Sequence, residues 1–514
     1  MQVYNPFLPL DEYIPDGEPH VFGDRVYLFG SHDKERGETF CMLPYAVWSA
    51  PVNDLRNWSC SGVIFDPKQD PRYDAEKAMH AYAPDVVKGN DGKFYLYYCL
   101  AGYRGVGGYS QPISVAVCDK PDGRYEYLGT VKNPDGSTFM KYVNFDPAVI
   151  NDDGVIRLYS GTWYGFEEPS QTRARGDILA QESEMFGKDM NHIEELWKAN
   201  DSVFGPFHMT LADDMMTLTS EPVRVLPLVH EGTPFADHGF FEGSSIRKIK
   251  DTYYFIYSSV NNHELCYATS KKPDRDFVYG GTIVSNGDIG YEGRHPEDRL
   301  NATGTTHGGI EQINGQWYVF YHRLTHKTDY SRQACAEPIT IADDGSIAQV
   351  EMTSCGLNGA PLLGCGEYPA PVCCNLTNGK MPHGTNVSLD VDIPCVSSEG
   401  DERYVHDVAN GTWVGYKYFD FGEGASSVTL TVRGTGHGEW KIYTKMDAPK
   451  SVGTLASAVP ETSANPPVGT ATAEPSEAWS EVRIETAGLK GISPLYINYN
   501  GDGKFDIKLI KIEK

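Results

Sequence analysis

The sequence predicts an all-β fold, namely a five-bladed β-propeller followed by a β-sandwich of the jelly-roll type. The first observation behind this prediction is the number of aromatic residues, which pack well on pleated strands: 32 Tyr, 21 Phe and 8 Trp. The second is the content of 53 Gly and 32 Pro, which indicates many turns. The third is a hairpin pattern that recurs in the first two thirds of the chain. Because the chain has 514 residues, two domains are expected.

The recurring pattern begins with a polar or acidic residue beside Pro or Gly, continues through a β-prone stretch and a turn, and ends in an aromatic or aliphatic strand. Its copies are DGEPHVFGDRVYLFGS (16–31), PDVVKGNDGKFYLYY (84–98), DPAVINDDGVIRLYSG (146–161), EGSSIRKIKDTYYFIYSS (242–259) and HGGIEQINGQWYVFYH (307–322). Two β-prone stretches joined by such a turn predict a hairpin, and repeated units of this kind indicate propeller blades. The longest interval between copies contains residues 179–200, LAQESEMFGKDMNHIEELWKAN, which we predict to be a helix inserted in a blade.

A propeller brings the leading residues of its repeats together, because the first strand of each blade lines the central channel. These leading residues are Asp16, Asp85, Asp146, Glu242 and His307. Although they are far apart in the sequence, we expect them to form one site on the channel axis.

The chain changes character after about residue 375, where Ser, Thr, Gly and Ala become frequent. Short β-prone stretches there predict the antiparallel strands of a β-sandwich. They are GTWVGYKYFDFG (411–422), SSVTLTVRG (426–434), EWKIYTKM (439–446), PLYINYNG (494–501) and KFDIKLIKI (504–512). The stretch TLASAVPETSANPPVGTATAEPSEAW (454–479) is polar and rich in Pro, and we predict a long loop there. With the join near MPHGTN (381–386), the predicted domains span residues 1–380 and 386–514.

Asp16, Asp146 and Glu242 are the candidate catalytic residues. Each leads a repeat beside Gly or Pro, where the backbone can approach the channel. Hydrolysis of a glycosidic bond with inversion needs one carboxyl group that protonates the leaving oxygen and another that activates a water on the opposite face of the sugar. A third carboxylate nearby raises the pKa of the acid by like-charge repulsion. A single acid at such a position commonly caps a turn, but three at equivalent positions favour a catalytic set.

The remaining leading residues have other expected roles. Asp85 is expected to be structural or to line the substrate pocket, with a catalytic role as the alternative. His80 and Tyr82, which precede it, are expected to line a sugar pocket, although core packing is an alternative for Tyr82. His307 is expected on the channel axis, where it would contact substrate, hydrogen-bond the acid or ligate a cation. Since a hard cation such as Ca²⁺ prefers oxygen, His307 would be a minor ligand.

The order of these motifs resembles glycoside hydrolase family 43, which contains arabinofuranosidases and β-xylosidases. The resemblance covers roughly residues 1–365. Its motifs are Ile14-Pro15-Asp16-Gly17, Tyr82-Ala83-Pro84-Asp85, Phe145-Asp146-Pro147, Phe241-Glu242-Gly243 and the Gly-His segment at residues 304–309. The chain departs from the family pattern in three places: Gly17 stands where Pro is common, Tyr82 replaces Trp, and two Thr separate Gly304 from His307.

The resemblance implies an inverting exo-glycoside hydrolase that releases terminal α-L-arabinofuranose or β-D-xylose from plant-derived arabinan, arabinoxylan or xylo-oligosaccharides. Asp16 would be the general base, Glu242 the general acid, and Asp146 the residue that tunes the pKa of the acid and orients it. An arginine in the last blade would hold the sugar, with Arg332 as the first candidate and Arg323 as the alternative. The resemblance also implies one structural Ca²⁺ on the propeller axis, with no cofactor required for the chemistry.

Two other functions stay open at this point. A propeller glycoside phosphorylase, or another glycosidase, is the first. A phosphorylase would need Arg, Lys and His around a phosphate and no carboxylate base, so Asp16 argues against it. A non-catalytic glycan-binding protein is the second, and its function would survive the change of Glu242 to Gln.

The C-terminal part resembles family 6 carbohydrate-binding modules. Residues 410–421 carry most of this resemblance, and Phe505-Asp506 is similar to the late strand of that family. Trp413 and Tyr416 are the predicted glycan contacts, because an exposed aromatic ring stacks on a sugar. Aromatic residues that alternate along a strand are also typical of a sandwich core, so burial is the alternative for both.

Charge and composition narrow the partners further. With 44 basic and 70 acidic residues, the formal net charge of −26 disfavours nucleic acid and anionic membranes but not a neutral oligosaccharide or polysaccharide. The sequence contains no apolar run long enough to span a membrane. The start MQVYNPFLPLDEY lacks a signal-peptide pattern, and 11 Cys without metal-type spacing suit a reducing compartment, so a cytoplasmic location is expected. A secreted protein without its signal would look the same, and the sequence does not indicate the oligomeric state.

Overall fold

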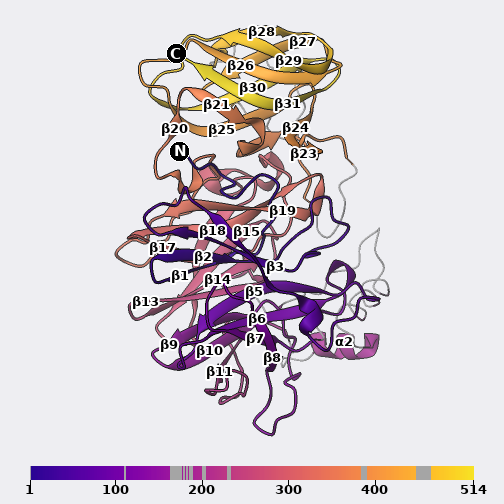
Figure 1. Ribbon diagram of the computed structural model, residues 1–514, viewed down its shortest axis with the longest axis vertical. Helices are drawn as coiled ribbons and strands as arrows, with labels where there is room; N and C mark the ends of the chain where they lie inside the picture. Colours follow the sequence, from indigo (N-terminus) through magenta and orange to yellow (C-terminus); the bar gives the residue numbers. More distant parts are fainter. Residues whose placement is uncertain are drawn as a thin grey trace.

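The protein is a β-structure in the part that the computed structural model describes, which confirms the predicted all-β class. The described residues are 2–108, 111–162, 176, 180, 183, 189–198, 204–227, 233–383, 391–446 and 465–514. Figure 1 shows two parts along the longest axis: strands β1–β19 form the larger one, and β20–β31 lie at the opposite end with the C-terminus. The N-terminal residues lie where the two parts meet.

The larger part contains five antiparallel sheets in its described residues, each built from strands that follow one another along the chain. The first sheet contains β1 (Glu18–Phe22), β2 (Arg25–Phe29), β3 (Tyr45–Pro51) and β4 (Ser59–Phe65). The second contains β5 (His80–Lys88), β6 (Phe94–Ala101), β7 (Ser114–Cys118) and β8 (Glu126–Thr130). The third contains β9 (Ala148–Asp152), β10 (Val155–Ser160), β11 (Phe207–Leu211) and β12 (Val223–Arg224). The fourth contains β13 (Phe240–Ile249), β14 (Thr252–Ser259), β15 (Glu264–Ser270) and β16 (Val278–Ser285). The fifth contains β17 (Ile310–Ile313), β18 (Gln316–Thr325) and β19 (Thr328–Ile339).

Hydrophobic cores join these sheets in sequence order. Separate clusters of buried apolar side chains link the first sheet to the second, the second to the third, the third to the fourth, and the fourth to the fifth. A further cluster links the fifth sheet to the first, with Phe320 of β18 and Leu28 of β2 among its members. The first strands also contact one another: β1 contacts β5 and β17, and β9 contacts β5 and β13. The leading ends of the five sheets therefore lie near one another.

The five predicted hairpins are confirmed as β1–β2, β5–β6, β9–β10, β13–β14 and β17–β18. Their turns have the backbone that the sequence requires. Asn314 and Gly315 both have positive φ, at 49° and 88°, and so do Asp153 and Gly154, at 51° and 92°. Two successive residues with positive φ match the right-handed twist of the flanking strands, which explains why Asn-Gly and Asp-Gly connect them.

The smaller part consists of two sheets that share one hydrophobic core. One sheet contains β20 (Leu362–Leu363), β22 (Asn375–Thr377), β25 (Trp413–Asp420), β27 (Gly438–Tyr443), β28 (Gly469–Ala473) and β30 (Ile492–Gly501). The other contains β21 (Gly366–Pro369), β23 (Cys395–Glu399), β24 (Glu402–Val408), β26 (Ser427–Gly434), β29 (Ser476–Glu485) and β31 (Phe505–Glu513). Trp440 and Phe505 connect them, with ring centroids 5.2 Å apart. The five strands predicted in this part are all present.

The chain enters the smaller part before the join predicted at residues 381–386. Strands β20 and β22 pair with β25, and β21 pairs with β31. These short strands precede the predicted join but form their hydrogen bonds with strands of the smaller part. A buried ion pair also connects the two parts: the ammonium of Lys417 lies 3.1 Å from Asp288 and 2.8 Å from Glu351.

The predicted loop at residues 454–479 is wrong in its second half. Residues 454–464 lie outside the described part, but β28 and the start of β29 occupy residues 469–473 and 476–479. The stretch GTATA at 469–473 forms a strand because it pairs with β27, although its Gly and Ala residues have a weak preference for strands. Of the helix predicted at 179–200, the structure describes α2 (Met190–Lys198) as helical, and most of the remainder lies outside the described residues.

All 11 cysteines are free thiols in the structure. In the described part of the chain, no helix has both the length and the apolar character that a membrane crossing requires.

Candidate active site

Irregular backbone places the three candidate carboxyl groups where β1, β9 and β13 begin. Asp16 and Asp146 each precede a strand by two residues, and their φ angles are positive, at 57° and 43°. Non-glycine residues rarely adopt this conformation, which costs energy and concentrates at functional sites. Glu242 lies in β13 at a register shift, and the following Gly243 has a φ of 75°. Regular strand geometry is thus interrupted at all three positions.

His307 lies between two of these carboxyl groups. Its Nδ1 is 4.0 Å from Asp16 and 3.7 Å from Asp146. Asp146 in turn accepts a hydrogen bond of 3.0 Å from the backbone N–H of Gly243, the residue after Glu242. A side chain at Gly243 would meet the His307 ring at 3.2 Å, so glycine allows this close approach. The structure therefore brings four of the five leading residues into one cluster.

Arg332, on β19, ties the Asp16 carboxylate to a second buried acid. Its Nη1 donates to Asp16 at 2.9 Å, while Nε and Nη2 donate to the two oxygens of Asp33 at 2.8 and 3.0 Å. All three side chains are buried. The bidentate pair with Asp33 fixes the guanidinium plane, and the remaining nitrogen then fixes Asp16.

The charge of Arg332 controls the ionisation of Asp16. Burial by itself would raise the pKa of Asp16, but the adjacent guanidinium is the largest of several contacts that together lower it. His322 supports the backbone at the same place. Its Nε2–H donates to the carbonyl of Thr305 at 2.8 Å, and its Nδ1 accepts the N–H of Asp16 at 3.3 Å. Burial and the charge of Arg332 lower the pKa of His322 to about 3, so this imidazole is neutral.

The pKa values of Glu242 and Asp146 shift upward, opposite to that of Asp16. Burial, followed by the charge of Asp16, raises the pKa of Glu242 to about 8. Burial and the neighbouring carboxylates Glu242 and Asp16 raise the pKa of Asp146 well above its usual range. The cluster therefore combines one carboxylate that stays ionised with a carboxyl group, Glu242, that keeps its proton at neutral pH. Such a pair can donate a proton on one side of a bound molecule and accept one on the other.

Aromatic rings form a wall beside this cluster. The guanidinium of Arg332 lies over the ring of Phe40, 4.7 Å from its centroid. Phe40 contacts Tyr330 and Tyr82 at centroid distances of 4.8 and 6.4 Å, and His80 lies half-buried at the start of β5. The Tyr82 ring is buried and packs on Phe40, so core packing accounts for its position at least as well as contact with a sugar.

Asp85 has a structural position, as favoured from the sequence. It is fully buried, and one oxygen lies 2.6 Å from His20 Nε2 while the other accepts the N–H of Val149 at 2.6 Å. Because Val149 belongs to β9, Asp85 links the second and third sheets. Arg323 is not part of the cluster: it donates to the carbonyls of Pro371 and Cys373, both at 2.6 Å, where the two parts of the chain meet.

The predicted glycan contacts of the C-terminal part are not exposed. Tyr416 is fully buried, and its hydroxyl donates to the carbonyl of Ala370 at 2.8 Å. Trp413 is also buried, with its ring centroid 5.0 Å from that of Tyr443. The aromatic residues of β25 thus pack in or beside the shared core. The prediction that Tyr416 stacks on a sugar is wrong.

Two residues of the site were not predicted. Asp33 follows β2 in the stretch Gly-Ser-His-Asp, and its partnership with Arg332 connects residues that are 299 positions apart. His322 is the last residue of the fifth repeat and lies on β18. The one signal for Asp33 was indirect: an arginine that is buried beside Asp16 requires further acidic partners.

Comparison with known proteins gives a consistent result. A sequence model of Glycosyl hydrolases family 43 matches residues 4–347. The Xylosidase/arabinosidase of Thermoclostridium stercorarium is 40% identical over 522 residues, which cover 99% of this chain and 98% of that protein. Xylosidase/arabinosidase 43A of Humicola insolens is 28% identical, over 65% of this chain and 96% of that protein. Among solved structures, the GH43_1 enzyme from Xanthomonas citri complexed with xylose is 27% identical over 66% of this chain and 91% of that chain, with a TM-score of 0.49.

Proposed function

This chain belongs to glycosyl hydrolases family 43 and is a glycoside hydrolase, and from that premise we propose that it removes terminal β-D-xylose or α-L-arabinofuranose from xylan- and arabinan-derived oligosaccharides. The names of the two relatives that include both sugars support this range.

One observation carries the proposed chemistry: Asp16 and Glu242 occupy one cluster with pKa values shifted in opposite directions. Glu242 is the general acid and donates its proton to the glycosidic oxygen. Asp16 is the general base, and it takes a proton from the water that attacks the anomeric carbon from the opposite face, which inverts the configuration. Asp146 accepts the hydrogen bond from the N–H of Gly243 and so orients the strand that carries Glu242. Arg332 holds Asp16 and contacts the sugar at the cleavage point.

The architecture proposed for this site is a five-bladed β-propeller, with the five sheets as blades. The core that connects the fifth sheet to the first supports this proposal, as do the contacts between the leading strands. The two C-terminal sheets are proposed to be a β-sandwich of the family 6 carbohydrate-binding kind. With Tyr416 and Trp413 buried, any glycan contact there must use other residues.

A Ca²⁺ on the axis is compatible with the residues around His307. The Nε2 of His307 and the hydroxyl groups of Thr305 and Thr306 are buried and have no hydrogen-bond partner among the described residues. One imidazole nitrogen and hydroxyl oxygens suit a cation whose other ligands are water. Such an ion would supply positive charge behind the carboxyl cluster, and the proton transfers would still belong to Glu242 and Asp16.

The proposal is tested with aryl xylosides and aryl arabinofuranosides on purified protein. We expect both Asp16→Ala and Glu242→Ala to lower the rate by about 10²–10⁴-fold. A strongly activated leaving group, such as dinitrophenol, should restore much of the rate of Glu242→Ala but not that of Asp16→Ala, because it departs without a proton. Glu221→Gln, an exposed carboxyl outside the site, is the control. NMR of the first-formed sugar should show inversion; a retained anomer, or a sugar phosphate formed only with inorganic phosphate, would overturn the mechanism.

A further inference from the structure

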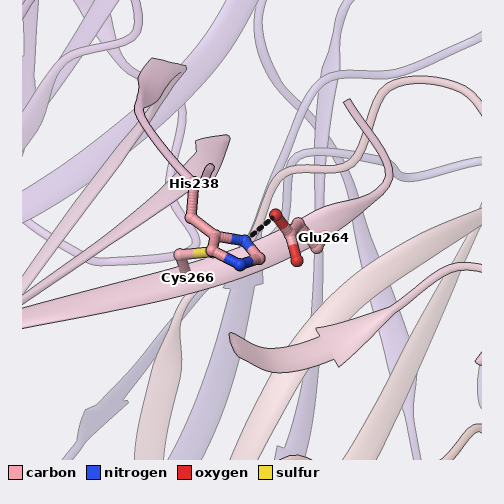
Figure 2. Close-up of side chains that lie close together, drawn as sticks. All are labelled: His238, Glu264 and Cys266. Carbon is pink, nitrogen blue, oxygen red and sulfur yellow. Dashed lines mark hydrogen bonds and ion pairs between the residues drawn. The ribbon is translucent and has the colours of Figure 1, made fainter. Parts of the chain in front are cut away.

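A second cluster of polar side chains lies on the fourth sheet, outside the carboxyl site. It contains His238, just before β13, and Glu264 and Cys266 of β15 (Figure 2). Glu264 and Cys266 are two residues apart on a strand, so their side chains leave the same face of the sheet. One ligand atom from each of the three residues lies within 4.8 Å of the other two. The proposed hydrolysis uses none of these groups.

Neighbouring residues hold the Glu264 carboxylate in place. Its Oε1 lies 2.6 Å from His238 Nδ1 and accepts hydrogen bonds from Ser259 at 2.6 Å and Asn261 at 2.8 Å. Its Oε2 accepts a hydrogen bond from Thr282 at 2.8 Å. Outer partners of this kind orient the first ligands of protein metal sites. The carboxylate is thus aligned before any ion arrives.

We propose that His238, Glu264 and Cys266 form a binding site for a borderline divalent transition metal of the Zn²⁺ class. Imidazole nitrogen, carboxylate oxygen and thiolate sulfur are the donors that such an ion prefers, whereas Ca²⁺ prefers oxygen alone. The local charge is also suitable. Glu264 is anionic, and among the described residues no ion pair joins it to a lysine or an arginine.

The distances allow an ion to enter with small movements. Ligand atoms of a tetrahedral Zn²⁺ site are about 3.3–3.7 Å apart, given metal–ligand bonds of about 2.0–2.3 Å. The 2.6 Å between His238 and Glu264 must therefore widen, as the ion replaces the hydrogen of that bond. Cys266 binds as a thiolate, and its proton leaves to solvent. The His238 side chain is 33% exposed, which gives the ion a route of entry from solvent.

The cluster of Glu18, His20 and Asp85 also places potential ligands close together, but its surroundings oppose a cation. Arg247 lies 3.0 Å from Glu18 and is buried with it. A divalent ion there would face a buried guanidinium. The His238 cluster is therefore the better candidate.

The test is Co²⁺ and Zn²⁺ binding to the full chain, with hydrolysis playing no part in the readout. All proteins carry Cys60→Ser, because Cys60 is an exposed thiol that could bind metal by itself. We expect one equivalent of Co²⁺ to produce the absorption of a thiolate-to-cobalt transition. Cys266→Ser should abolish this band, and Thr282→Val, which removes a bond to Glu264, should weaken binding by roughly tenfold or more. Cys118→Ser, a partly buried thiol outside the cluster, should bind like the parent.

Three results would overturn the proposal: no thiolate band in the parent, an unchanged band in Cys266→Ser, or Ca²⁺ binding as tightly as Zn²⁺ at the same residues. Should Cys266→Ser fold poorly, His238→Gln provides the same test at a partly exposed side chain, with circular dichroism as the check on folding. Since the readout is metal binding, its failure would leave the proposed hydrolysis untouched.

Discussion

Replacement of Glu242 by Gln should make the protein more stable at neutral pH while removing its activity. Burial and the charge of Asp16 raise the pKa of Glu242 from 4.5 to about 8 in the folded chain. At pH 7 the folded protein thus keeps a proton that the unfolded chain has lost. The interval of about 2.5 pH units between 4.5 and 7 corresponds to about 3 kcal/mol of unfolding free energy. Gln ionises in neither state, so Glu242→Gln avoids this loss.

The sign of the effect fixes its pH window. A raised pKa contributes stability below pH 4.5, and that contribution is lost as the pH rises from 4.5 to about 8. The stability gain of Glu242→Gln over the parent should therefore be near zero at pH 4 and reach about 3 kcal/mol at pH 7. Urea unfolding at several pH values measures it, with Glu423→Gln, an exposed acid, as the matched control. Parallel stability curves for parent and Glu242→Gln would show that folding does not raise the pKa of Glu242.

Three further predictions concern the site and the C-terminal core. The rate of hydrolysis should fall as the pH rises through about 8, because Glu242 then loses its proton. This fall should be smaller for a substrate with a dinitrophenyl leaving group, and an equal fall would show that another residue is the acid. Arg332→Ala should lower the free energy of unfolding by about 3–5 kcal/mol and also lower activity, because Asp16 and Asp33 are left as unpaired buried charges. Denaturant unfolding measures the loss of stability, and a change below about 1 kcal/mol would contradict the buried pairing. Tyr416→Phe should cost about 1–2 kcal/mol through the loss of a buried hydrogen bond but leave polysaccharide binding unchanged, as affinity electrophoresis would show; weakened binding would restore Tyr416 as a glycan contact.

The local sequence was sufficient to predict the hairpins. Turns such as Asn314-Gly315 need positive φ at both positions, and few sequences other than Asn-Gly and Asp-Gly supply it, so the pattern identifies the element without tertiary information. The leading positions of Asp16, Asp146 and Glu242 follow from the same repeat. The loop predicted at 454–479 failed in its second half for the opposite reason: a stretch with weak local preference became a strand because β27 was available to pair with it.

The class of fold, the repeat and the carboxyl residues that lead it could be read from the sequence, because turn chemistry and side-chain alternation act over a few residues. Which charges lie next to each other depends on the tertiary structure. Asp33 pairs with Arg332 across 299 positions of the chain. Arg332 helps to lower the pKa of Asp16, with which it forms an ion pair, whereas burial and Asp16 raise the pKa of Glu242 to about 8. An ionisation state depends on the solvent excluded and on the charges within a few ångströms, and those distances exist only once the sheets have packed.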